Sequence, residues 1–186
     1  MVLAVSRLVP EKGLEYLIEA VGLLPAPRPN LVVVGTGPLR QRLAQLAAAR
    51  GVSLHMVGGL QPAEMPPVYA SADVFVMPSV TTRTFKEPWG LACNEAMCQA
   101  LPVVATTAVG AAAGGLVQDG VTGLVVPERD PQALGQAISR LLRDRSFARE
   151  LGQRGKERVK QTNWEAMVAG FEAAVDYALR KRGATV

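Results

Sequence analysis

The chain has 186 residues, of which 49% are hydrophobic and 19% charged, as expected of a soluble globular protein that is too short for two large domains. Its net charge of +4 is modest, and its basic residues lack interleaved aromatic residues, which argues against a nucleic-acid-binding surface. No secretory leader is recognisable at the start, because residues 1–5 have neither a basic segment before them nor a full apolar core.

The two cysteines bear on the compartment. Cys93 and Cys98 lie five residues apart in one predicted helix, a spacing that suits neither a disulfide nor a zinc pair. We predict that both are reduced thiols in the core and that the protein is cytoplasmic.

Short apolar runs alternate along the chain with longer stretches of helical period, the pattern of a parallel sheet with helices on both faces. The predicted strands are residues 2–5, 31–34, 52–57, 74–77, 103–106 and 122–126. We therefore expect an α/β fold with a Rossmann-like parallel sheet of about six strands, formed by residues 1–130. His55, the only histidine, is expected to be a packed residue of the third strand rather than a base.

Between and after these strands lie segments whose apolar residues recur with the period of a helix. They are Leu14, Leu17, Ile18 and Val21, then Leu39, Leu43, Leu46 and Ala47, and then Leu134, Ile138, Leu141 and Leu142 behind an N-cap at Asp130. The closing segment 131–186 continues with helices predicted at 146–161 and 164–182. The last helix has its own apolar stripe, formed by Met167, Phe171, Ala174, Val175 and Ala178. Part of that stripe is expected to be exposed.

One uncharged stretch, residues 96–118, is long enough to span a bilayer, but Pro102 and three glycines interrupt it. Much of it consists of small residues. We predict instead the end of a helix, a buried strand and a loop.

Residues able to bind a ligand follow the predicted strands. Arg7 follows the first strand, Gly35 the second, Gly58 the third, Glu87 the fourth and Gly110 the fifth. The carboxyl ends of parallel strands meet at one edge of a sheet, where open α/β folds bind their ligands. We therefore expect these loops to converge on one crevice.

The stretch from Glu87 to Glu95 has the features of a phosphate site. A helix that begins near Trp89 or Gly90 leaves its first backbone N–H groups, including that of Leu91, available to an anion. Glu95 lies on the second turn, and helical side chains lean toward the N-terminus, so its carboxylate points back toward the anion. Two carboxylates beside an anion site favour a ligand with hydroxyls next to its phosphates, such as a nucleotide sugar.

Other interpretations of these residues remain open. Arg7 and Lys12 flank the loop after the first strand, where two cations can contact a diphosphate, or they are merely exposed charges. Trp89 either lines a sugar pocket or anchors its helix. Glu95 is either a ligand residue or an ordinary helix carboxylate, and Glu87 is either a ligand residue or a loop-surface carboxylate.

Glu87 and Glu95, with seven residues between them, lie in Glu-Pro-Trp-Gly-Leu and Asn-Glu-Ala-Met and resemble the signature of the retaining glycosyltransferases of family 4. Further motifs follow the order of that family: Ser6-Arg7-Leu8 with Glu11-Lys12-Gly13, Gly35-Thr36-Gly37-Pro38, Ala72-Asp73-Val74, Leu101-Pro102-Val103-Val104-Ala105 and Asp119-Gly120-Val121-Thr122-Gly123. The resemblance covers nearly the whole chain. It implies one half of a GT-B fold, the C-terminal donor-binding domain, with an N-terminal acceptor domain expected to be missing from this chain.

The resemblance also implies roles for single residues. Arg7 and Lys12 match the cations that neutralise the departing nucleoside diphosphate, with help from the helix amides at Gly90 and Leu91. Glu95 matches the residue that binds the ribose hydroxyls, and Glu87 the residue that holds the transferred sugar. No metal-site motif is recognisable, and the GT-B class is metal-independent, so no cofactor is expected.

The implied function is sugar transfer from a nucleoside-diphosphate sugar to an acceptor with the anomeric configuration kept, and the isolated domain is expected to be inactive. One alternative is a sugar-nucleotide epimerase of the same architecture, and another is a non-catalytic Rossmann-type binding module. Membrane contact is expected only through the parent enzyme. The sequence departs from the family pattern at Ala100 and over residues 111–116, where a loop containing a glutamate is common, so the ligand contacts of that loop stay open.

Overall fold

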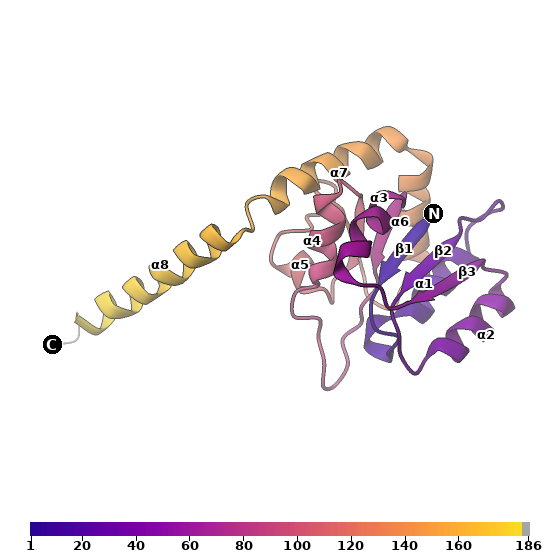
Figure 1. Ribbon diagram of the computed structural model, residues 1–186, viewed down its shortest axis with the longest axis horizontal. Coiled ribbons are helices and arrows are strands. Elements are labelled where there is room, and N and C mark those ends of the chain that lie inside the picture. The colour runs from indigo at the N-terminus through magenta and orange to yellow at the C-terminus, as the bar shows by residue number, and fades with distance from the viewer. Residues whose placement is uncertain (184–186) are drawn as a thin grey trace.

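The computed structural model describes residues 1–183, with a parallel sheet of six strands at its centre in the order β3-β2-β1-β4-β5-β6 (Figure 1). The strands are β1 (Val2–Val5), β2 (Leu31–Val34), β3 (Leu54–Gly58), β4 (Val74–Met77), β5 (Val103–Thr106) and β6 (Leu124–Val126). The order reverses between β1 and β4, which makes this the topological switch point of a Rossmann-like fold. The predicted fold class is confirmed.

Two strands begin later than predicted. Strand β3 begins at Leu54 because the N–H of Val52 bonds to the carbonyl of Ala47 at 2.9 Å and closes the end of the preceding helix. Strand β6 begins at Leu124 because the N–H groups of Thr122 and Gly123 donate to the carbonyl of Gln118 in the preceding turn, at 3.0 and 3.3 Å. In both cases a local turn takes the backbone groups that the sheet would otherwise pair.

Helices cover both faces of the sheet. The helices α1 (Leu14–Gly22), α2 (Arg40–Arg50) and α6 (Pro131–Arg143) pack on one face, and α3 (Met65–Ala70), α4 (Leu91–Cys98) and α5 (Gly110–Ala113) pack on the other. Successive strand residues point to opposite faces, so Val2 and Ala4 enter one apolar cluster and Leu3 enters the second. The predicted stripe of α1 is fully buried, and Asp130 caps α6 by accepting the N–H of Ala133 at 2.9 Å.

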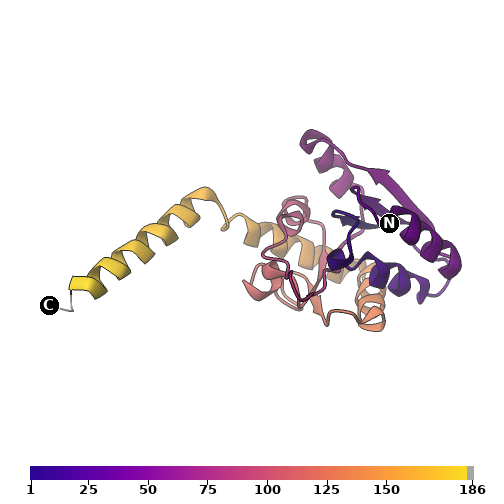
Figure 2. The same cartoon turned by 90° about the horizontal axis from the view of Figure 1, so that it is seen from below.

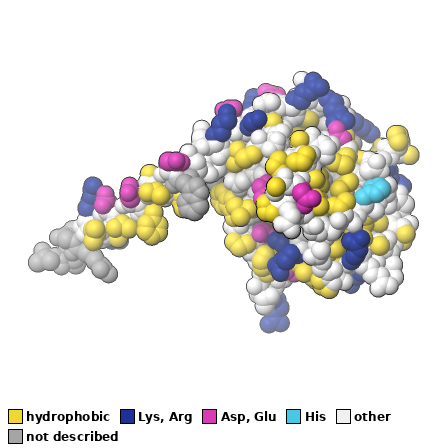
Figure 3. Space-filling view, viewed as in Figure 1, with side chains coloured by type: hydrophobic (Ala, Val, Ile, Leu, Met, Phe, Trp, Pro, Cys, Tyr) yellow, Lys and Arg dark blue, Asp and Glu magenta, His cyan; other side chains and the backbone are white. Residues whose placement is uncertain are grey.

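Two side chains that were predicted to be buried are exposed. His55 lies on β3, an edge strand with a neighbour on one side only, and its ring reaches the surface (Figure 3). Cys98 is exposed at the end of α4, whereas Cys93 is buried as predicted. A step of five residues turns about 140° around a helix axis, so the two thiols cannot both face the sheet.

The closing helices are α7 (Arg145–Val159) and α8 (Trp164–Gly183). Helix α7 packs against α4 and α6, and Gly152 approaches so closely that a Cβ there would lie 2.0 Å from the carbonyl oxygen of Ala100. Helix α8 extends away from the rest of the chain, with Met167 56% and Phe171 74% exposed (Figures 1 and 2). No helix within residues 1–183 is both long and apolar enough to cross a membrane. The division of the chain at residue 130 stays a prediction.

Candidate functional site

A buried ion pair joins the loops after β1 and β4. Lys12 ends the short 3₁₀ helix Pro10–Lys12, and its ammonium group contacts Oε2 of Glu87, with only 11% and 8% of the two side chains exposed. The hydroxyl of Ser79 donates to the same carboxylate oxygen at 3.2 Å. The Lys12 ammonium also lies 5.2 Å from the centre of the Phe85 ring. Lys12, predicted to contact the phosphates, and Glu87, predicted to contact the sugar, thus lie in direct contact, and their opposite charges compensate each other.

The chain reaches this pair through a close backbone approach at Gly13. Gly13 has a φ of 63°, and a Cβ on it would lie 1.9 Å from the carbonyl oxygen of Pro78. Only glycine meets both conditions without strain. The motif Glu11-Lys12-Gly13 therefore combines the cation with the residue that lets it reach Glu87.

The segment that carries Glu87 is clamped by the loop after β5. The N–H of Gly110 donates to the carbonyl of Glu87 at 3.0 Å. The N–H of Ala111 donates to the carbonyl of Trp89 at 2.7 Å. Gly90, with a φ of 95°, is then the N-cap of α4, and a Cβ there would lie 2.6 Å from the sulfur of Met77. Helix α4 therefore begins at Leu91, within two residues of the predicted start.

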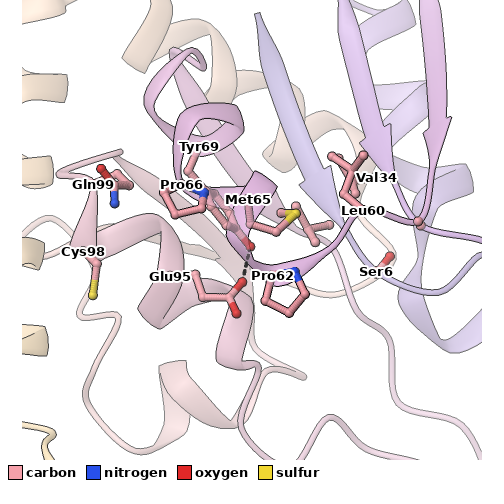
Figure 4. A pocket seen from close by; sticks show the side chains of 13 residues that line it. Ser6, Val34, Leu60, Pro62, Met65, Pro66, Tyr69, Glu95, Cys98 and Gln99 are labelled. Atoms are coloured by element: carbon pink, nitrogen blue, oxygen red, sulfur yellow. Dashed lines mark hydrogen bonds between the residues drawn. The ribbon is translucent and has the colours of Figure 1, made fainter.

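A cavity of about 470 Å³ lies at the carboxyl edge of β1, β2 and β3 (Figure 4). Glu95 and Tyr69 border one side of it, and Ser6, Gly35 and Leu60 border the other. The Tyr69 hydroxyl donates to Glu95 at 2.5 Å. The Ser6 hydroxyl is buried, and it makes no hydrogen bond to any residue in the described chain. The cavity therefore offers a carboxylate and a free hydroxyl to a ligand that carries hydroxyl groups.

The other predicted site residues lie outside this cavity. Arg7 is largely exposed, and its guanidinium lies 3.6 Å from the carboxylate of Glu11. Trp89 donates its indole N–H to Asn94 at 2.8 Å, and its ring packs on Gly114, which supports the anchoring interpretation. It borders a second cavity, of about 680 Å³, beside the start of α8.

Three residues that contact the predicted site residues or border the cavity were not predicted as ligand residues. Ser79 lies two residues after β4, so the rule that ligand residues follow strands could have found it. Ser6 follows β1 in the same way. Tyr69 gave only a weak signal, a hydroxyl in an otherwise apolar helix, because its partner Glu95 lies on another element.

Burial controls the protonation of two groups near the site. Burial, together with the neighbouring Glu95 carboxylate, raises the pKa of Tyr69, so its hydroxyl stays protonated at neutral pH. Burial, with a smaller contribution from the charge of Glu87, raises the pKa of the Cys93 thiol to about 12. Cys93 is therefore a packed thiol rather than a nucleophile. No group of three or more His, Cys, Asp or Glu side chains within residues 1–183 is arranged to hold a metal ion.

Solved structures share this fold. Sucrose-phosphate synthase from Thermosynechococcus elongatus is similar with a TM-score of 0.80 and 33% identity, over 97% of this chain and 45% of that one. HepE from Anabaena, solved in complex with UDP, has a TM-score of 0.78 and 25% identity over 95% of this chain and 48% of that one. The Rossmann-like sheet and its closing helices are thus those of one domain of a GT-B glycosyltransferase.

The family follows from the sequence comparison. The model of the family described as glycosyl transferases group 1 matches residues 1–158, and the chain belongs to this family. A GDP-mannose-dependent alpha-(1-6)-phosphatidylinositol monomannoside mannosyltransferase from Mycobacterium tuberculosis is 38% identical over 178 residues, which cover 90% of this chain and 45% of that protein. A sulfoquinovosyl transferase from Arabidopsis thaliana is 34% identical over 172 residues, or 89% of this chain and 31% of that protein. The chain thus spans less than half the length of these relatives.

Proposed function

We propose that this chain is the donor-binding domain of a retaining glycosyltransferase and binds a nucleoside-diphosphate sugar. The observation that carries the proposal is the pair of carboxylates on either side of the α4 N-terminus, Glu95 at the cavity and Glu87 in its ion pair with Lys12. A diphosphate on the helix amides would then have a carboxylate for hydroxyl groups on each side. Relatives named as mannosyl and sulfoquinovosyl transferases support this assignment.

Each part of the donor has a place in this arrangement. The ribose lies in the cavity against Glu95, the diphosphate against the amides of Gly90 and Leu91 with Arg7 nearby, and the sugar against Glu87. A bound diphosphate attracts Lys12, and Glu87 is then free to accept the sugar hydroxyls. The acceptor would be bound by a second domain, for which the relatives have room outside the segment that this chain matches.

The reaction we propose is a front-face displacement. The bond between the anomeric carbon and the diphosphate oxygen breaks, and the acceptor oxygen forms its bond on the same face of the sugar. The acceptor proton passes to the departing diphosphate oxygen, which leaves as part of the nucleoside diphosphate. Arg7, Lys12 and the helix amides stabilise the negative charge that develops on the leaving group. This assigns to the chain's own cations the neutralisation that a metal ion could otherwise provide.

Calorimetry of the chain with GDP, UDP and ADP tests which nucleobase the site binds, and whether it binds a nucleoside diphosphate at all. GDP comes first because the mannosyltransferase relative is named as GDP-mannose-dependent, and UDP is included because of the HepE complex. We expect one of the three to bind, and the chain alone to transfer no sugar. The absence of binding at millimolar concentration of all three would contradict a donor domain.

Calorimetric titration with a nucleotide sugar, together with an assay for free sugar, separates the alternatives. An epimerase would bind the donor but release free sugar without an acceptor, and a non-catalytic module would bind no nucleotide sugar.

The two free thiols, Cys93 and Cys98, support the proposal of a reducing, cytoplasmic compartment.

The two glutamates are expected to respond differently to substitution. Glu95→Gln should weaken the binding of both the nucleoside diphosphate and the nucleotide sugar by about 1–3 kcal/mol, because a charged hydrogen bond to the ribose is lost. Glu87→Gln should weaken the binding of the nucleotide sugar only. Titration of both variants with both ligands tests this, and equal losses in all four titrations would refute the separate roles.

A further inference from the structure

Glu95 is an exposed carboxylate held in one orientation by a buried tyrosine. The Tyr69 hydroxyl, on α3, donates to Oε2 of Glu95, on α4, at 2.5 Å (Figure 4). Tyr69 as a whole is 1% exposed, and its ring packs edge-on against Phe75, with ring centroids 5.7 Å apart and planes inclined at 63°. The ring cannot turn without disturbing the core, so its hydroxyl is a fixed point for the carboxylate.

The Tyr69 hydroxyl keeps its proton in the neutral pH range. Burial and the bond to Glu95 raise the pKa of Tyr69, so its proton remains available to the carboxylate. The second carboxylate oxygen, Oε1, makes no hydrogen bond to another residue in the part of the chain that is described. One oxygen of Glu95 is thus bonded within the protein, and the other is left for a ligand in the cavity.

Fixing the carboxylate matters because Glu95 lies at the surface. A surface glutamate samples several rotamers, and a ligand that selects one of them loses affinity through the ordering of the side chain. Tyr69 orders the carboxylate before any ligand arrives. This effect should appear only with ligands that contact the carboxylate.

We propose that Tyr69 is a positioning residue that acts through Glu95 and gives the site its preference for nucleotides with ribose hydroxyls. The inference rests on the proposed function, in which the cavity takes the ribose of a nucleoside diphosphate. Tyr69 also borders the cavity, but its hydroxyl donates its proton to Glu95, so it acts by holding the carboxylate. A purely structural tyrosine would affect the stability of the fold but not the ability to tell ribose from dideoxyribose.

The test is calorimetry of the chain with GDP, UDP and ADP, each beside its 2′,3′-dideoxy analogue. We expect wild type to bind one of the three more tightly than its analogue by about tenfold or more, as for a hydrogen bond to a charged group. Tyr69→Phe should reduce that preference at least about threefold while leaving the affinity for the analogue unchanged. Tyr16→Phe, on α1 away from the cavity, is the matched control and should keep the preference.

A second variant keeps the test independent of whether Tyr69→Phe folds. Glu95→Asp retains the charge at an exposed position but shortens the side chain by one methylene, which withdraws it from the Tyr69 hydroxyl. We expect it to lose the ribose preference as well. A full preference in Glu95→Asp or in folded Tyr69→Phe, or an equal loss for both ligands, overturns the inference alone. Failure of wild type to bind any of the three diphosphates overturns the proposed function and the inference with it.

Discussion

Lys12→Met is expected to lower the free energy of unfolding by about 3–5 kcal/mol, because it leaves the Glu87 carboxylate buried without its cation. The two side chains are only 11% and 8% exposed, so water cannot replace the lost partner. Ser79 supplies a hydrogen bond at 3.2 Å but no charge. Urea denaturation of the chain, followed by circular dichroism, measures the change.

Two further variants show whether burial is the reason. Adding Glu87→Gln to Lys12→Met removes the unpaired charge and should restore at least about 1 kcal/mol. Arg154→Met breaks a surface pair with Glu150, in which both side chains are about half exposed, and should cost less than about 1 kcal/mol. Similar losses for Lys12→Met and Arg154→Met would show that the Lys12 pair contributes no more than a surface contact.

Gly110→Ala is expected to have the second large effect, a loss of about 3 kcal/mol in stability, at the upper end for overpacking. The added Cβ would lie 1.9 Å from the carbonyl oxygen of Pro88, 2.4 Å from its carbonyl carbon and 2.9 Å from Cα of Trp89. All three are backbone atoms, so no side-chain rotation relieves the contact. The segment that carries Glu87 must move, and the affinity for the nucleotide sugar should fall with the stability.

Gly170→Ala is the matched control, because within residues 1–183 a Cβ at that position would meet no atom within 4 Å other than those of its chain neighbours and its own helix backbone. It lies inside α8, where alanine is favoured over glycine, so the midpoint of urea denaturation should stay the same or rise slightly. A Gly110→Ala variant as stable as this control would mean that the two loops separate at little cost.

The ion pair also bears on how the proposed site works. In the unliganded chain Lys12 and Glu87 compensate each other, although one is assigned to the diphosphate and the other to the sugar. Under the proposed function, a donor with both parts can take over the two partners together, whereas a nucleoside diphosphate alone leaves Glu87 without a new one. The complete nucleotide sugar is therefore expected to bind more tightly than the bare diphosphate.

The sequence by itself determined the fold class and the placement of most strands and helices, although the short helices α3 and α5 were not predicted. The strands at 2–5, 31–34, 74–77 and 103–106 have the predicted bounds, and Asp130 caps its helix as predicted. These features depend on the periodicity of apolar residues and on capping, both of which act between residues close in sequence. Gly90, at the start of the helix that carries Glu95, was recognisable because a helix start is also specified by residues close in sequence.

Only the tertiary structure decided which side chains meet. The Lys12–Glu87 pair joins residues 75 positions apart, and the bond from Tyr69 to Glu95 spans 26 positions. It also decided that His55 and Cys98 are exposed, since their exposure depends on which strand forms the sheet edge and which side of α4 faces it. Local sequence patterns specify that a residue lies on a strand or helix. Its partner across the fold depends on how the elements pack, and no periodicity along the chain contains that information.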